Sequence, residues 1–175
     1  MIRSLRGKAP TIHPTAFISE TAYIVGDVEI GENSSIWPGV VGRCEGGRVV
    51  IGKNVCVQDN SVIHGGDMYI GDNVAFGHGV MSHVERIEGN VLIGNGAVLG
   101  NWVSIGEHCL IAAGSIVVEG TTIPANSLVR GVPAKVVGPV AEKHLEVIRG
   151  VWEPYVKLGR LYKREGLEEP RGGDA

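Results

Sequence analysis

The feature that most constrains this chain is a ladder of apolar residues spaced six positions apart. It runs without a slip from Ile12 to Ile36, and again from Ile87 to Val129. A period of six fits neither a helix, with about 3.6 residues per turn, nor a long strand, with a period of about two. It is typical of a β-helix, in which each hexad forms a short strand and a corner, and three hexads complete one triangular coil.

Composition agrees with narrow, repeated layers. Glycine is abundant, with 27 residues, and aromatic residues make up only 5% of the chain. Many glycines directly follow a ladder residue, where a Cβ would crowd a tight corner. A β-sandwich is the alternative, but its turn signals would recur every 8 to 12 residues or so. We therefore predict an all-β solenoid, a parallel β-helix of hexapeptide repeats.

The period changes after the ladder. Pro133 and Pro139 end the strand pattern, and the apolar residues Ile148, Val151 and Tyr155 then mark one face of an amphipathic helix. We expect four segments: an N-terminal extension over 1–10, the β-helix over 11–138, a helix over 139–164 that packs on the solenoid, and a flexible, polar tail over 165–175.

Charge and cysteine content exclude several classes of function. The net charge is −3 with both signs interspersed, which does not favour nucleic acid as a partner. No apolar run reaches the length of a membrane span, and no signal peptide precedes the ladder. The three cysteines have no CxxC spacing. We therefore expect no disulfide framework, no membrane partner and a cytoplasmic location.

The ladder is interrupted where histidines occur. Three extra residues follow Ile36 and predict a loop near Glu45–Gly47, one extra residue follows Ile63, and one residue is missing after Ser82. Three of the six histidines lie among these interruptions. This clustering predicts that the working face of the solenoid is here.

Two of these histidines are in register. His64 directly follows Ile63 and His83 directly follows Ser82, so they occupy equivalent places on successive coils. Both imidazoles can then reach one ion at about 2.0–2.1 Å. His78 lies on a different face, and we expect it to join the ion of a neighbouring subunit in a cyclic homotrimer. Three protein nitrogens would leave a fourth position open, as in catalytic zinc sites. The other three histidines are interpreted as ordinary surface residues.

The segments GRCE, VQDNSVIH, IGDNVAFGHGVMSH, NVLIGNGAVLG and SLVRGVPAKVV resemble the gamma-class carbonic anhydrase family, which includes ferripyochelin-binding-protein-like members. The resemblance covers residues 10–162. It implies a left-handed β-helix, a homotrimer, and reversible hydration of CO2 to bicarbonate. It also implies a zinc ion, or Fe2+ or Co2+ in its place, shared between subunits by three histidines.

The resemblance assigns the metal ligands by position. His64, His78 and His83 match the ligands of the family, with His78 contributed by the neighbouring subunit. Gln58 matches the glutamine that hydrogen-bonds the water on the metal.

Four further residues match less directly. Arg43 and Asp59 correspond to residues that form ionic contacts across the interface beside the site, and Glu45 would help to hold Arg43. Tyr155 resembles a tyrosine of the C-terminal helix that approaches the site.

The chain also departs from the family. Cys44 and Glu45 stand where the family reads Gly-Asp, and Cys56 stands where it has Asn. The segment Gly65–Tyr69 is too short for the acidic proton-shuttle loop of well-known members. Three alternatives therefore stay open: a weak or inactive trimeric scaffold, a hexapeptide acyltransferase that uses coenzyme A, and a metal-dependent thioesterase.

Overall fold

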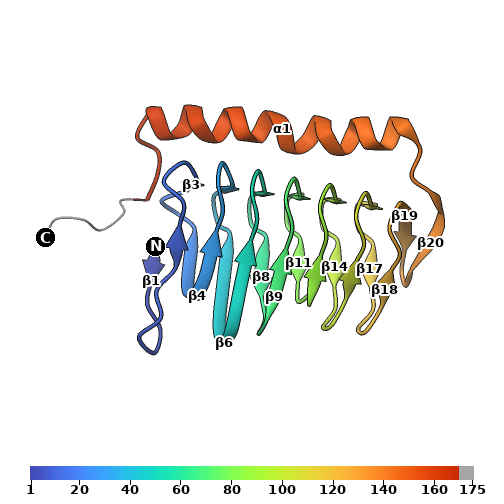
Figure 1. The fold of residues 1–175 in the computed structure, drawn as a ribbon, viewed down its shortest axis with the longest axis horizontal. Helices are drawn as coiled ribbons and strands as arrows, with labels where there is room; N and C mark the ends of the chain where they lie inside the picture. Colours follow the sequence, from blue (N-terminus) through green and yellow to red (C-terminus); the bar gives the residue numbers. More distant parts are fainter. Residues whose placement is uncertain (170–175) are drawn as a thin grey trace, which may run out of the picture.

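A computed structural model describes residues 1–169, which form a parallel β-solenoid of about seven turns with one helix laid along it (Figure 1). This confirms the predicted fold class, a hexapeptide-repeat β-helix. The elements are β1 (Ile2–Arg3), β2 (Thr11–Ile12), β3 (Phe17–Ile18), β4 (Tyr23–Ile30), β5 (Ser35–Ile36), β6 (Val41–Ile51), β7 (Cys56–Val57), β8 (Val62–His64), β9 (Met68–Ile70), β10 (Ala75–Phe76), β11 (Met81–Ser82), β12 (Arg86–Ile87), β13 (Leu92–Ile93), β14 (Val98–Leu99), β15 (Ser104–Ile105), β16 (Leu110–Ile111), β17 (Ile116–Val117), β18 (Thr122–Ile123), β19 (Ser127–Gly131), β20 (Ala134–Pro139) and α1 (Glu142–Arg164).

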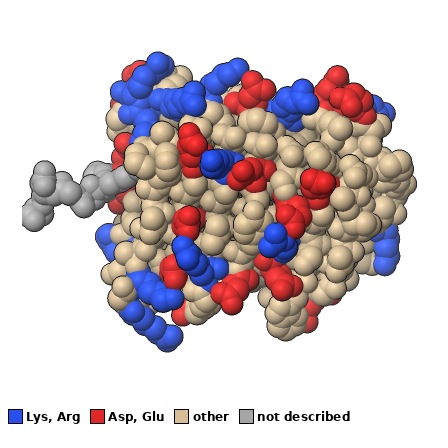
Figure 2. Space-filling view, in the orientation of Figure 1, with Lys and Arg blue, Asp and Glu red and all other residues tan. Residues whose placement is uncertain are grey.

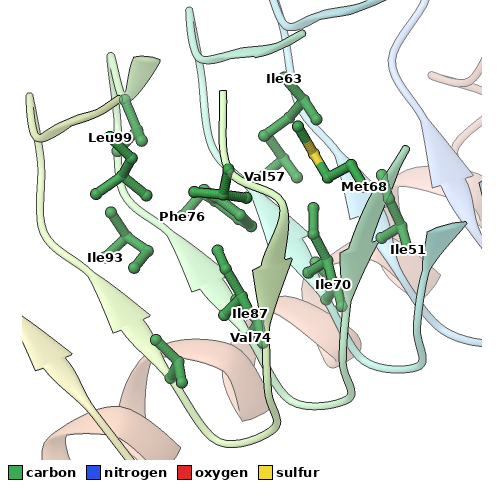
Figure 3. Packing of buried hydrophobic residues seen from close by; sticks show 14 of the residues in the cluster. Ile51, Val57, Ile63, Met68, Ile70, Val74, Phe76, Ile87, Ile93 and Leu99 are labelled. Carbon is green, nitrogen blue, oxygen red and sulfur yellow. The ribbon is translucent and has the colours of Figure 1, made fainter. Parts of the chain in front are cut away.

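The ladder residues point into the solenoid and stack in three columns, one for each face of the triangle (Figure 3). The first column is Ile18, Ile36, Val57, Phe76, Ile93, Ile111 and Val129. The second is Ile30, Ile51, Ile70, Ile87, Ile105 and Ile123. The third is Ile24, Gly42, Ile63, Ser82, Leu99 and Val117.

The third column is the thinnest, because two small residues flank Ile63 in it. A Cβ at Gly42 would lie 2.9 Å from Cδ1 of Ile24, so a side chain at that position would require Ile24 to move. The Ser82 hydroxyl is buried and has no hydrogen-bond partner within residues 1–169. An unsatisfied buried hydroxyl costs free energy of folding. The column directly behind the two predicted histidine ligands is therefore thinly filled.

The extra residues after Ile36 lie within the bounds of β6 but are exposed and unpaired with β4 over 45–48, where the sequence predicted a loop near Glu45–Gly47. The start of β6 pairs with β8 and its end pairs with β9, so residues 44–48 stand between the two pairings. Gly26 of β4 pairs with Cys44 and Val28 pairs with Val49, so residues 45–48 have no partner in β4 and bulge out opposite Asp27. This projection holds Glu45 beside the next coil.

Asparagines line one corner of the solenoid. Asn33, Asn54, Asn73 and Asn90 all have positive φ, a conformation that asparagine tolerates better than most residues. Each side-chain amide donates to the next, over 3.4, 2.9 and 3.1 Å. Arg160 of α1 donates to Oδ1 of Asn33, the free acceptor at the start of this asparagine ladder, over 3.1 Å.

Helix α1 returns along the solenoid over the strands β3, β5, β7 and β10 (Figure 1), as predicted from its apolar face. Ile148 and Gly159 of the helix are buried, and Gly159 lies against Phe17 and Ser35. The rings of Tyr155 and Tyr162 pack edge-on against Trp37, with centroids 5.1 and 5.0 Å away. These contacts fix the helix relative to the coils.

Both ends of the described chain attach to the first coils. β1 pairs in parallel with β4, so part of the predicted N-terminal extension belongs to the solenoid. The predicted flexible tail begins too early, because Ser19 bridges Glu168 and the Glu169 amide donates to the Ile18 carbonyl over 2.8 Å. Residues 170–175 of that tail lie outside the described residues.

The surface agrees with the composition. Lys and Arg are interspersed with Asp and Glu on the face drawn in Figure 2. All three cysteines are unpaired and buried. Among residues 1–169, no helix is both long enough and apolar enough to cross a membrane.

Candidate metal centre

His64 and His83 lie side by side on adjacent coils. Ile63 in β8 is in register with Ser82 in β11, and each histidine follows directly. Nδ1 of His64 lies 3.2 Å from Nε2 of His83, and the two rings meet edge to face with centroids 5.2 Å apart. The structure therefore brings together the two residues that the spacing predicted to be neighbours.

The distance between these two nitrogens suits a shared ion. Two Zn–N bonds of about 2.0–2.1 Å at the tetrahedral angle separate their nitrogens by about 3.3 Å. The observed 3.2 Å between Nδ1 of His64 and Nε2 of His83 is close to that value. The pair can hold two positions of a tetrahedral metal site without a change of backbone register.

The projection of β6 places Glu45 against the far side of His64. Oε2 of Glu45 lies 3.0 Å from Nε2 of His64, and Oε1 of Glu45 accepts from Nη1 of Arg43 over 2.6 Å. Arg43 is in register with His64 on the neighbouring strand. The sequence predicted that Glu45 holds Arg43 but missed the contact with His64.

The electrostatics keep His83 uncharged. Burial lowers the pKa of His83 below its usual 6.5, and His64 and Arg43 lower it further. A depressed pKa favours the neutral imidazole at physiological pH. Only the neutral ring can offer a lone pair to a metal ion.

His78 lies in a second cluster, on a different corner. Asp59 and His78 each follow a ladder residue by two positions, on β7 and β10, and these strands are in register. Oδ2 of Asp59 lies 3.0 Å from Nδ1 of His78, and the His78 amide donates to Oδ1 of Asn95 over 3.0 Å. The sequence interpretation missed the Asp59–His78 contact, although their equal offset from the ladder could have revealed it.

A cavity of about 470 Å³ opens beside His78, between the solenoid and α1, and Gln58 and Tyr155 help to line it. Gln58 is only 4% exposed. Burial raises the pKa of the Tyr155 hydroxyl, so the hydroxyl is neutral at physiological pH. Gln58 and Tyr155 therefore lie with His78, and both supply neutral hydrogen-bonding groups.

Cys56, which replaces the asparagine of the resembling family, is buried next to this cluster. Burial raises the pKa of its thiol to about 12. The thiol is therefore protonated at physiological pH, whereas metal ligation requires the thiolate. Cys56 acts as a small, buried packing residue.

The two clusters do not meet within one chain. Residues 1–169 contain no group of three or more His, Cys, Asp or Glu side chains that could hold a metal ion. His64 and His83 supply two ligand nitrogens, and Glu45 contacts the opposite side of His64. Within residues 1–169, the pair has no third protein ligand.

An apolar strip runs along the face that carries the histidine pair. The outward residues of β8, β11, β14 and β17 are in register. Of these, Met81 is 45% exposed and Ile116 is 38% exposed, and Trp102 nearby is 66% exposed. We call this set of outward residues the apolar strip: Val62, Met81, Val98 and Ile116.

Comparison with known proteins gives two kinds of relative. Residues 9–41 and 86–119 match the bacterial transferase hexapeptide family, in six repeats. The solved structure of a putative acetyltransferase from Bacillus cereus superposes with a TM-score of 0.90 at 36% identity, covering 94% of this chain and 98% of that one. A hexapeptide transferase family protein from Anaplasma phagocytophilum gives 0.83 at 32% identity, covering 93% and 98%.

Among curated proteins, the chain is 40% identical to a carbonic anhydrase of Geobacillus kaustophilus, over 93% of this chain and 91% of that protein. It is 43% identical to a probable carbonic anhydrase of Methanocaldococcus jannaschii, over 81% and 91%. The mitochondrial gamma carbonic anhydrase 2 of Arabidopsis thaliana is 32% identical over 90% of this chain, which spans 60% of that longer protein. The chain belongs to the gamma carbonic anhydrase family.

Proposed function

We propose that the protein is a metal-dependent carbonic anhydrase, which interconverts CO2 and bicarbonate. The observation that carries this proposal is the pair of imidazole nitrogens, on His64 and His83, held 3.2 Å apart on successive coils. The family relationship supports the same activity. Zn2+ is the ion that fits an all-histidine set best, with Fe2+ or Co2+ as substitutes.

The site is completed in a homotrimer, with His78 lent by the neighbouring subunit. The His78 side chain is 50% exposed, so its ring is available to another chain. The apolar strip beside the histidine pair supports a subunit contact on that face, because exposed apolar patches are typical of interfaces. Identical chains around a threefold axis would then form three equivalent sites.

The reaction divides between the ion and the side chains. A bound zinc ion would supply Lewis acidity and lower the pKa of water to about 7, a value already established for carbonic anhydrases. Gln58 orients an oxygen of the substrate through its amide, which is held in place by burial. Arg43, fixed by Glu45, favours the anionic product electrostatically.

Three measurements on one preparation test the proposal: metal content, molar mass in solution, and the rate of CO2 hydration. We expect about one metal ion per chain, a mass three times that of the chain, and catalysis that depends on the metal. His64→Ala should lose metal and activity together. Zinc loading, and iron loading under anaerobic conditions, guard against a false negative.

Two outcomes would contradict it. A monomer that still binds the ion tightly would refute the shared site. A trimer that is fully loaded with metal but does not hydrate CO2 would be an inactive scaffold. The replacements at Cys44, Glu45 and Cys56 are the reason for considering that alternative.

Acyl transfer or acyl hydrolysis is the second candidate, favoured by the putative acetyltransferase from Bacillus cereus that shares this fold at 36% identity. Coenzyme A titration of metal-free protein distinguishes an acyltransferase, because such an enzyme would bind coenzyme A without any ion. Hydrolysis of acyl thioesters by the loaded protein would indicate the metal-dependent thioesterase.

A further inference from the structure

Each of the two histidine clusters pairs one imidazole with its own carboxylate, but at opposite ring nitrogens. Glu45 contacts Nε2 of His64, and Asp59 contacts Nδ1 of His78, both over 3.0 Å. The Glu45 contact is a hydrogen bond, and the Asp59 contact is an ion-pair distance. In a neutral ring, a carboxylate beside one nitrogen favours the N–H there and leaves the other nitrogen with its lone pair. The nitrogens that keep a lone pair are therefore Nδ1 of His64, which faces Nε2 of His83, and Nε2 of His78.

These free nitrogens are the ones that the proposed site needs. Nδ1 of His64 is the atom that lies 3.2 Å from Nε2 of His83, so Glu45 turns the correct side of the ring toward the pair. Nε2 of His78 is the ring nitrogen farther from the backbone. The longer reach suits a ligand that must cross to a neighbouring subunit.

Both carboxylate–histidine contacts are themselves held in place. Arg43 donates to the second oxygen of Glu45 over 2.6 Å, which fixes the carboxylate plane. The corner that carries His78 is fixed by its amide, which donates to Asn95 over 3.0 Å. Groups that hold a ligand's second nitrogen set the orientation of the ring and raise its affinity for metal.

We propose that Glu45 and Asp59 are positioning residues that select which nitrogen of His64 and of His78 binds the metal ion. The inference rests on the proposed function and adds a role for both carboxylates that differs from an ionic contact across the interface. The extra methylene of Glu45, compared with the aspartate usual in the family, lets one side chain reach both Arg43 and His64.

The first test measures zinc affinity by competition with a chelator. Glu45→Gln and Asp59→Asn should each weaken zinc binding by roughly 10- to 100-fold, the usual effect of losing such a contact. Glu85→Gln is the matched control, because Glu85 lines the pocket beside His83 and its change removes the same charge. Unchanged affinity in both test variants, or an equal loss in the control, would overturn the proposal.

The second test reads the ring nitrogens directly, through imidazole 15N NMR. Wild-type protein should show zinc on Nδ1 of His64 and on Nε2 of His78. In metal-free Glu45→Gln, Arg43 should hold the amide oxygen, so the amide N–H faces Nε2 of His64 and moves the ring proton to Nδ1. Zinc on the opposite nitrogen of either ring, or an unmoved proton, would refute the assignment.

The two tests separate this inference from the function on which it rests. Wild-type protein that binds no zinc stoichiometrically would overturn both. Wild-type protein that binds zinc and hydrates CO2, but through other ring nitrogens, would overturn only the roles of Glu45 and Asp59.

Discussion

The coils over residues 91–129 and those over residues 41–90 share one repeat but differ in regularity. In the later coils the six-residue spacing has no exception, and strands β13 to β18 are all two residues long. In the earlier coils β6 extends over 11 residues, β8 and β9 have three, and one ladder position is a serine. Both histidine–carboxylate contacts lie in these irregular coils.

The difference teaches where a repeat protein places its chemistry. A perfect coil can only stack on its neighbours, because every side chain at a given position meets its own equivalent. The extra residues of β6 break that equivalence and bring Glu45 beside His64. The regular coils supply stability and register, and the irregular coils supply the site.

The largest expected effect is a loss of zinc affinity that occurs in the irregular coils and not in the regular coils. His83→Ala removes a proposed ligand, so zinc affinity should fall by at least about 100-fold and activity with it. His108→Asn in the regular coils should leave both unchanged, because asparagine suits its positive φ. Competition with a chelator and a CO2 hydration assay measure the two effects. If His108→Asn also lost metal, the site would not be confined to the irregular coils.

Core truncation should reveal the difference in packing. Ile111→Ala in the regular coils should cost the free energy of unfolding about 3–5 kcal/mol, near the upper end for such a change. Ile63→Ala should cost about 2 kcal/mol, because Gly42 and Ser82 already leave its column thin. Urea denaturation of metal-free protein measures both. Equal losses would show that the two regions are packed alike.

Acid should destabilise the irregular coils first. The pKa of His83 is lowered mainly by burial, so His83 contributes its full stability above about pH 6.5 and loses it as the pH falls toward the folded value. Metal-free protein should therefore have a lower urea midpoint at pH 5.5 than at pH 7.5. His83→Gln should reduce that difference, and His108→Asn should not.

The smallest expected effect is a change in the free energy of unfolding when the Ser82 hydroxyl is removed. Ser82→Ala removes a buried hydroxyl with no hydrogen-bond partner in the described part of the chain, and should raise the free energy of unfolding by about 1 kcal/mol. Ser115→Ala in the regular coils removes a hydroxyl of the same kind and serves as the matched variant. A lower melting temperature in Ser82→Ala would mean that this hydroxyl has a partner.

The fold could be predicted from the sequence because the repeat is a local signal. A six-residue period fixes which residues point inward, and it predicts that His64 lies next to His83. Its interruption also predicts where the extra residues project, near Glu45–Gly47. It does not predict that this bulge stays within one long strand, opposite Asp27, or that Glu45 turns toward His64.

The candidate site was predictable only in part for the same reason. The offsets of Asp59 and His78 from their ladder residues are visible in the sequence, but the contact between their side chains depends on rotamers at a corner. The predicted start of the flexible tail is too early. Its polar composition does not reveal that the backbone of Glu168 and Glu169 pairs with Ser19 and Ile18.

The asparagine ladder carries a consequence for the helix. Its amide dipoles all point the same way, so the acceptor left at Asn33 gathers partial negative charge, and the guanidinium of Arg160 neutralises it. The ladder holds although the coils differ in length, since Asn33, Asn54, Asn73 and Asn90 are 21, 19 and 17 positions apart. The position of α1 is thereby linked to the corner asparagines rather than to the number of residues in each coil. If one asparagine lost its amide, the line of amides would break, and the acceptor that anchors the far end of the helix covering Gln58 and His78 would lose its added charge.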